Sequence, residues 1–587
     1  MKHLALLSLL TLTTPMWAST SAPSNIWQAK FSGGSLSGIV ASKGQTTPVK
    51  GYYKHGFTEQ GWTVDQFGSD MCALCPTSTN VETPINAAMR TPSFTIPAEG
   101  AVLTWSARSV LPGMEESYEV VIAEPDGTET VVATVEAESS RRFVTRSVSL
   151  EEFAGKNVSV IMRCTSSNKY MLAVKEMMVG NSSSYCVNAR NTSMRYAQNA
   201  VPQGSLFMVT GELLNTGNLA LPRGTELRAM FGNDIIGSMT LDEDLASAAT
   251  LSFSFPADAR DNATSAYEVQ LVTPEGTPET LFESDVTRSY FVRNHFIDEG
   301  TGVWCNNCPQ GALEIDDLEE EFPDQIIPVC THVNDVFANV GYWPNLDFYA
   351  VPYFMLNRNH STAFSDTRKF DGHLNVPTIA GLTMKKCEIS RNRQQATVEI
   401  YITVSEDLNN ASGRYGVGYV MTAPFYVPDG DKSFMQQNMS SSAKARQYYF
   451  LPNVIPSSLS FYRHVSLTSG YAFTPVPGSL PESVKAYDAV TTELQLNCPD
   501  MVPTIDEATL VAFVLDTTDG SILNAVSYKI GDEIDENVGT GMVTLGEEVT
   551  QGAPEYYTLQ GIRVANPQAG QMVIERRGSS VRKFIAR

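Results

Sequence analysis

Short runs in which apolar and polar residues alternate recur along most of this 587-residue chain, and turn-forming clusters separate them. Residues 118–122 and 158–162 are examples, with turn residues at 112–113 and 125–127. Alternation with a period of two is typical of half-buried β-strands, and many short strands with little helical periodicity favour β-sandwiches. We therefore predict a multidomain chain that is mainly β.

Composition limits the classes of function. At about 150 residues per domain, the length suggests roughly four domains. The chain has 41 Lys and Arg against 64 Asp and Glu, a net charge of −23. A surface this acidic repels phosphate backbones, so we expect no nucleic-acid partner. The sequence contains no Gly-x-Ser-x-Gly, His-Glu-x-x-His or phosphate-binding loop, so hydrolase activity has no support.

The N-terminus predicts export. A basic start at Lys2 is followed by an apolar run over 4–12 and small residues near Ala18 and Ala22, which is the pattern of a secretory signal peptide over 1–22. The first cysteine is Cys72, so no lipidated cysteine follows the signal. No later stretch is apolar for long enough to cross a bilayer, so we expect no transmembrane helix.

Two β-domains follow the signal. Residues 23–182 resemble the jelly-roll modules of secreted bacterial adhesins and surface peptidases, through the ordered segments at 62, 91–97, 103–105, 117–120, 149–156 and 170–174. Lys175 and Glu176 stand where those modules usually place acidic residues, so we expect a scaffold or weak binding module and do not carry over a calcium or sugar site from the resemblance. Residues 183–288 fit an immunoglobulin-like (Ig-like) sandwich. The turn at 215–217 resembles that of adhesion-type Ig-like domains, which implies a spacer.

The pattern changes over residues 289–380. A strand candidate at 290–296 leads to Trp304, Cys305, Cys308 and Pro309, followed by apolar residues at helical spacing and an apolar strand over 326–333. Pro352 precedes another strand at 353–356. We therefore predict an α/β domain here, followed by a β-sandwich over 381–545.

A cysteine pair in this position suits redox chemistry. A helix N-terminus stabilises a thiolate, so we expect Cys305, just ahead of the helix, to be the nucleophile and Cys308 to be the resolving cysteine. Pro309 fits the first helical turn, where its missing N–H is not needed. An X-Pro bond adopts the cis form at a cost of only about 0.5–1 kcal/mol, so Pro352 could lie cis beside the pair.

The segment from Trp304 to Pro309, with the strand that leads to Asp335, resembles the thioredoxin-like outer-membrane proteins of Bacteroidetes. The similarity extends to residues 511–515. It implies a thioredoxin-like fold, no cofactor, and protein thiols or disulfides as partners. Two functions stay open: thiol–disulfide exchange through Cys305 and Cys308, or a non-catalytic adhesin or scaffold that binds glycan or protein. The pair could instead be a structural disulfide, whereas a zinc half-site lacks a second ligand pair nearby.

Seven further cysteines are present, and an odd total leaves one unpaired. The second C-x-x-C, Cys72 and Cys75, lies in a β-rich region without a strand-to-helix junction, so we interpret it as a structural disulfide. We expect Cys330, within the apolar strand, to be a buried free thiol. The remaining structural disulfide candidates pair within proposed β-domains, namely Cys164 with Cys186 and Cys387 with Cys498.

In the last segment, 546–587, the sequence pattern predicts a three-strand meander with turns at 566–567 and 578–579. It resembles the C-terminal sorting domains of Bacteroidetes type IX secretion substrates. The resemblance implies an export machinery as partner and delivery to the outer membrane, the cell surface or the medium.

Overall fold

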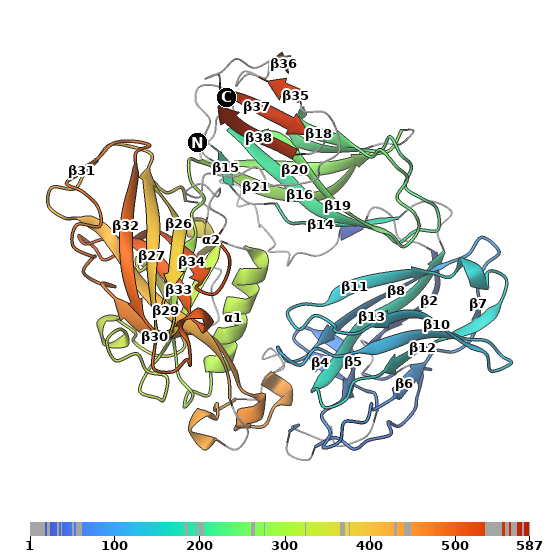
Figure 1. The fold of residues 1–587 in the computed structure, drawn as a ribbon. Coiled ribbons are helices and arrows are strands. Elements are labelled where there is room, and N and C mark those ends of the chain that lie inside the picture. The colour runs from blue at the N-terminus through green and yellow to red at the C-terminus, as the bar shows by residue number, and fades with distance from the viewer. Residues whose placement is uncertain are drawn as a thin grey trace, which may run out of the picture.

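The computed structural model describes most of residues 24–534, together with residues 18–19 and four short strands between 555 and 585. Between 24 and 534 the description leaves out 32–33, 37, 50–51, 54–60, 182–185, 194–195, 199–204, 260–263, 275, 277, 323–324, 364–369, 375, 428–430 and 440–447. Most of the expected signal segment, and both turns of the expected C-terminal meander, lie outside the described residues. The prediction of a multidomain, mainly β chain is confirmed (Figure 1).

The first unit is a sandwich of two six-stranded sheets. One has the order β10-β9-β12-β6-β3 with β7 beside β12, and the other has the order β11-β8-β13-β5-β4 with β2 beside β13. Alternate residues of each strand enter the space between the sheets because the side-chain period of a strand is two. Trp105 of β8 and Tyr118 of β9 are fully buried there. The strands are β2 (Ser24–Lys30), β3 (Val40–Ala41), β4 (Thr63–Phe67), β5 (Asp70–Pro76), β6 (Ala87–Arg90), β7 (Phe94–Thr95), β8 (Val102–Ser109), β9 (Tyr118–Ala123), β10 (Glu129–Val135), β11 (Val144–Ser149), β12 (Asn157–Cys164) and β13 (Met171–Asn181).

The second unit is a nine-stranded sheet around a core of its own. Its 215–217 turn is organised by Asn215, whose Nδ2 donates to Leu219 O (2.8 Å) and Leu245 O (3.0 Å) while its Oδ1 accepts from Gly217 N (3.0 Å). A buried amide therefore fixes this turn and the backbone at Leu245 at once. The strands are β1 (Ala18–Ser19), β14 (Val187–Asn191), β15 (Tyr196–Gln198), β16 (Ser205–Asn215), β17 (Glu226–Phe231), β18 (Asp234–Thr240), β19 (Thr250–Ala259), β20 (Thr264–Val272) and β21 (Glu279–Ser289).

The third unit is built on an eight-stranded sheet with the order β25-β24-β22-β23-β30-β29-β33-β34. β22 (His295–Thr301) and β23 (Ile326–His332) are parallel and are joined through helix α1 (Cys308–Glu321), while β24 (Tyr353–Leu356) is antiparallel to β22. A three-stranded sheet, β26-β27-β32, shares a core with β29 and β33. The other elements are β25 (His360–Ala363), α2 (Asp371–Leu374), β26 (Ala380–Ile389), β27 (Gln395–Val404), β28 (Leu408–Asn409), β29 (Tyr415–Tyr426), β30 (Phe461–Gly470), β31 (Ser483–Val484), β32 (Ala489–Asn497), β33 (Thr509–Asp516) and β34 (Ile522–Lys529).

One sheet therefore contains strands from both sides of the expected boundary between residues 380 and 381. β23 pairs in parallel with β30 at Cys330 and Val465, which are 135 positions apart in the chain. The strand expected at 290–296 also differs from the structure, because β22 runs from His295 to Thr301 and buries the acidic residues Asp298 and Glu299.

A crossing segment, which we define as residues 431–439 and 448–460, leaves the third unit between β29 and β30. It is orange in Figure 1 and reaches toward the first unit, which we call the jelly roll below after the fold expected for residues 23–182. Phe450, Leu451, Ile455 and Leu459 form one apolar cluster with jelly-roll residues that include Tyr53, Phe67, Leu111 and Tyr170. Tyr170 Oη also donates to Phe450 O (3.2 Å). The first and third units are thus joined by a packed contact.

The C-terminal strands form a separate four-stranded sheet with the order β36-β35-β37-β38. The strands are β35 (Glu555–Tyr557), β36 (Arg563–Val564), β37 (Met572–Arg577) and β38 (Ser580–Ile585). In the part of the chain that the structure describes, no helix has both the length and the apolar character needed to cross a membrane.

Candidate functional site

Cys305 and Cys308 form a disulfide at the N-terminal end of α1, with their Cα atoms 5.4 Å apart. Cys308 is the first helical residue, Pro309 lies in the first turn, and Asn307 at the N-cap makes no side-chain capping bond. The first turn contains no acidic residue. The helix dipole therefore acts on the sulfur atoms without a compensating carboxylate in that turn.

The peptide bond between Val351 and Pro352 is cis, and it lies against the disulfide. Cys305 Sγ is 3.5 Å from Val351 O. On the other side of the proline, a Cβ atom placed on Gly311 of α1 would lie only 2.8 Å from Pro352 Cβ. The absence of a side chain at Gly311 therefore lets α1 approach the proline closely.

Trp304 forms the exposed edge of the site. Its side chain is 50% exposed, and its Nε1 donates to Val333 O (2.7 Å). Cys305 and Cys308 are only 5% and 3% exposed. Both cysteines are therefore largely covered, whereas the neighbouring indole is open to solvent.

A buried carboxylate lies beneath the helix. Glu299 of β22 is 2% exposed, and burial raises its pKa to about 7. Its Oε2 accepts from Cys330 Sγ (3.0 Å), while its Oε1 has no hydrogen-bond partner among the described residues. A Cβ atom on Gly311 would collide with this Oε1, so the oxygen lies directly under α1 one turn after Cys308. The group can take up a proton near neutral pH.

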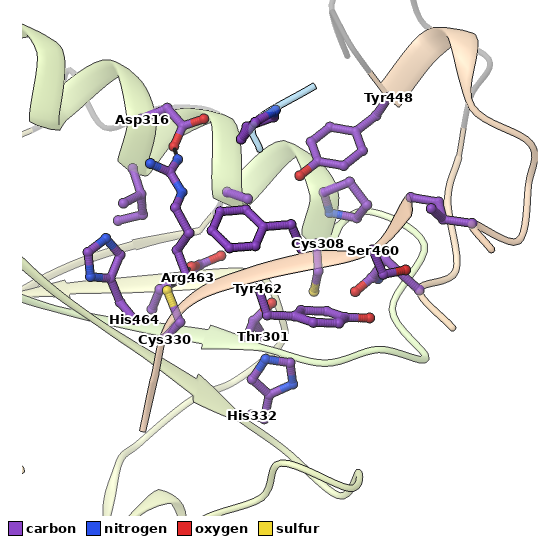
Figure 2. A pocket seen from close by; sticks show the side chains of 18 of the residues that line it. Thr301, Cys308, Asp316, Cys330, His332, Tyr448, Ser460, Tyr462, Arg463 and His464 are labelled. Carbon is purple, nitrogen blue, oxygen red and sulfur yellow. Dashed lines mark hydrogen bonds and ion pairs between the residues drawn. The ribbon is translucent and has the colours of Figure 1, made fainter. Parts of the chain in front are cut away.

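Cys308, Glu299 and Cys330 also line a cavity of about 70 Å³ at the junction of α1, β30 and the crossing segment. Figure 2 shows Cys308 above Tyr462, and Arg463 extended toward Asp316 of α1. Leu111 and Pro112 of the jelly roll contribute to the wall. The first unit therefore helps to enclose the inner side of the cysteine pair.

The crossing segment is bonded directly to the C-x-x-C loop. Gln436 Nε2 donates to Cys305 O (3.0 Å), Gln437 N to Val303 O (2.7 Å) and Met439 N to Asn306 O (2.9 Å). Carbonyl groups on three residues of the loop thus have partners in the segment that docks on the jelly roll.

None of the other seven cysteines is disulfide-bonded in the structure. Cys72 and Cys75 belong to different apolar clusters, the first facing the crossing segment and the second lying inside the jelly roll against Cys164. Cys186 lies near the 215–217 turn of the second unit. Burial raises the pKa of Cys330 well above its ordinary value. Cys387 Sγ lies near Ile530 O, whereas Cys498 Sγ lies near Val502 O.

Two half-buried aromatic rings mark a second candidate site, on the jelly roll. Trp27 of β2 and Phe94 of β7 come from different sheets and stack with centroids 6.0 Å apart and an angle of 12° between the rings. Both rings also pack against the hydrophobic core of this unit, so the part of each ring that is turned to solvent is what a ligand can meet.

Sequence reasoning missed Glu299 and the Trp27–Phe94 pair. Glu299, which immediately precedes Gly300, was itself a usable signal in the sequence, because acidic residues are seldom buried without a functional role. The aromatic pair had no signal, since the rings are 67 positions apart. No group of three or more His, Cys, Asp or Glu in the described residues is arranged to hold a metal ion.

These features define a multidomain β-sandwich protein with a disulfide at a strand–helix junction. No protein family matches the chain, and no curated protein sequence matches it. Among solved structures it is similar to HBP35 of Porphyromonas gingivalis, with 13% identity over 50% of this chain and 98% of that chain and a TM-score of 0.30. The K3 cleaved adhesin domain of Lys-gingipain from the same species has 14% identity over 27% of this chain and 98% of that chain (TM-score 0.21). A xylan-binding domain from Paenibacillus barcinonensis has 12% identity over 27% and 97% (TM-score 0.20).

Proposed function

We propose that the protein is an exported cell-surface binding protein whose jelly roll recognises a glycan or a protein. The observation that supports the proposal is the Trp27–Phe94 pair, two near-parallel rings that are partly open to solvent. A pyranose ring or an aromatic side chain stacks on such a surface, and aromatic anchors of this kind dominate binding energy. Adhesin and carbohydrate-binding domains are among the proteins similar to this chain, and the proposed role is of the same class.

Screening of the full-length protein on arrays of plant and bacterial glycans and of extracellular proteins tests this function. Trp27→Ala should weaken the binding of any ligand found by about thirtyfold, since loss of an anchor costs about 2 kcal/mol. Tyr487→Ala, at an exposed aromatic residue of the third unit, is the matched control and should bind normally. Equal binding by wild type and Trp27→Ala would contradict the assignment of the site.

We propose thiol–disulfide exchange as a second function, performed by a thioredoxin-like unit over residues 289–380 whose strands β22 to β25 belong to the larger sheet of the third unit. The supporting observation is the Cys305–Cys308 disulfide between a helix N-terminus and cis-Pro352, above the buried carboxyl of Glu299. The two functions occupy different units and are compatible with each other.

The chemistry follows from the positions of these groups. The Cys305 thiolate attacks a substrate disulfide, forming a bond to one substrate sulfur while the other leaves as a thiolate. Glu299 then accepts the proton of the Cys308 thiol. The Cys308 thiolate attacks Cys305 Sγ, and the remaining substrate sulfur leaves. The chain's dithiol loses two electrons, and the substrate disulfide gains them.

Alkylation of the reduced full-length protein near neutral pH tests the exchange. Cys305 should be labelled before Cys308, because it lies ahead of the helix and beside the exposed indole. The protein should also reduce insulin, and Cys305→Ser should abolish that activity. Equal labelling of both cysteines, or no reduction of any disulfide by the wild type, would refute this function.

A further inference from the structure

The pairing of β22 with β23 places a third cysteine beside the buried carboxyl. Glu299 and Cys330 are register partners in the two parallel strands, and Cys330 Sγ donates to Glu299 Oε2 at 3.0 Å. Both side chains are buried, at 2% and 8% exposure. A thiol is a weak, neutral donor, so it fixes one oxygen of the carboxyl without cancelling its charge.

The second carboxyl oxygen of Glu299, Oε1, is available to accept a proton. Oε1 has no partner among the described residues and lies under Gly311, which follows Cys308 by three residues on the same helix face. Rotation of the carboxyl would move Oε1 away from that position. The Cys330 hydrogen bond therefore sets the direction in which the free oxygen points.

We propose that Cys330 is a positioning residue for Glu299, and that this weak thiol donor holds Oε1 toward the Cys305–Cys308 pair. The inference rests on the thiol–disulfide exchange proposed above. Cys330 stays a thiol throughout and forms no bond with the substrate. Its role is to keep the proton acceptor of Cys308 oriented and to stabilise its ionised, proton-accepting form.

The other charges near Glu299 are already engaged. Arg463 of β30 pairs with Asp316 and Glu319 of α1, and His464 Nε2 lies 3.2 Å from Glu319 Oε1. His332 of β23, which lines the same cavity, pairs with Asp335 (2.7 Å). Cys330 is thus the direct hydrogen-bond donor to the Glu299 carboxylate, and Arg463 acts on it only through space.

The test measures the rate at which Cys308 closes the disulfide with Cys305, which is the second phase of the reduction of a substrate disulfide. Full-length protein in a Cys387→Ser/Cys498→Ser background, which removes the two half-buried thiols, is reduced and mixed with a small aromatic disulfide. The first released thiolate reports attack by Cys305, and the second reports closure by Cys308. A Cys308→Ser variant, which should lack the second phase, identifies it.

The wild-type closure rate should rise with pH through a transition near 7, the pKa to which burial raises Glu299. Cys330→Ala removes a hydrogen bond to the ionised form, so the transition should move up by about 0.5–1 pH unit. Closure well below the transition should then slow by about three- to tenfold. Cys330→Ser retains a donor and should restore the wild-type profile.

Infrared difference spectroscopy of the Glu299 carboxyl, assigned with Glu299→Gln, gives a readout that does not depend on exchange. An unchanged carboxyl pKa and closure profile in Cys330→Ala, with wild-type melting behaviour, would overturn the role of Cys330. If the wild type reduces no disulfide, the proposed exchange fails, while the infrared titration still decides whether Cys330 controls the carboxyl.

Discussion

Glu116 closes one end of the jelly roll through hydrogen bonds from two segments. It accepts from Thr77 Oγ1 (2.8 Å) and from Tyr170 N (2.9 Å), and it is fully buried. Burial raises its pKa to about 7 despite these bonds. A carboxyl with a raised folded-state pKa binds its proton more tightly in the folded chain. Its contribution to stability is therefore complete below the unfolded pKa and is lost as the pH rises through about 7.

We expect the wild-type free energy of unfolding to fall between pH 4.5 and 8 and Glu116→Gln to reduce that fall. A pKa raised from 4.5 to about 7 corresponds to about 3 kcal/mol of lost stability for this group. Urea unfolding at a series of pH values measures the effect. Glu82→Gln, on the surface of the same unit, should keep the wild-type slope. A Glu116→Gln slope equal to that of the wild type would show that Glu116 does not titrate in this range.

At the scale of elements, the contact between α1 and Pro352 depends on Gly311. Alanine normally stabilises a helix interior by about 1 kcal/mol relative to glycine. Here its Cβ would collide with Glu299 Oε1 and lie 2.8 Å from Pro352 Cβ. We therefore expect Gly311→Ala to lower the melting temperature and to slow closure of the cysteine pair. A melting temperature at or above that of the wild type would contradict this packing.

The crossing segment couples two units. Phe450 stacks on Phe67 with centroids 6.1 Å apart, while Gln436, Gln437 and Met439 bind the C-x-x-C loop. Truncation of a buried Phe costs about 3–5 kcal/mol. Phe450→Ala should therefore speed hydrogen exchange both at 170–174 and at 302–306, as measured by mass spectrometry of the full-length protein. Faster exchange confined to 170–174 would show that the segment does not transmit the change.

At the scale of elements, physical reasons explain which strands and helix ends could be predicted from the sequence and which could not. A short apolar run after Pro352 predicted the strand at 353–356 well, because nearly all of its side chains are buried. The helix start was predictable because Pro309 follows the cysteine pair. Asp298 and Glu299 interrupt the apolar residues of β22, so the sequence pattern did not indicate a buried strand there. Their burial depends on partners far along the chain. Arg358 and Tyr342 bond to Asp298, and Cys330 bonds to Glu299.

At the scale of the whole molecule, the C-terminal strands form a sheet of their own. A small sheet buries little apolar area, so deletion from residue 548 onward should leave the melting transition unchanged. In the native host we expect the truncated protein to accumulate in the periplasm, because residues 546–587 resemble a sorting signal. Calorimetry and cell fractionation measure the two effects. Surface delivery of the truncated protein would mean that the segment is not the sorting signal.

The parallel pairing of β23 with β30 has a consequence for biosynthesis. Synthesis proceeds from the N-terminus, so β23 is complete long before Val465, its partner in β30, has been added. Until then the hydrogen-bonding edge of β23, which contains Cys330, is uncovered. Pairings between distant segments form slowly. β30 contributes Tyr462, Arg463 and His464 to the wall of the cavity around Cys308, so that wall is completed only after most of the chain has been synthesised.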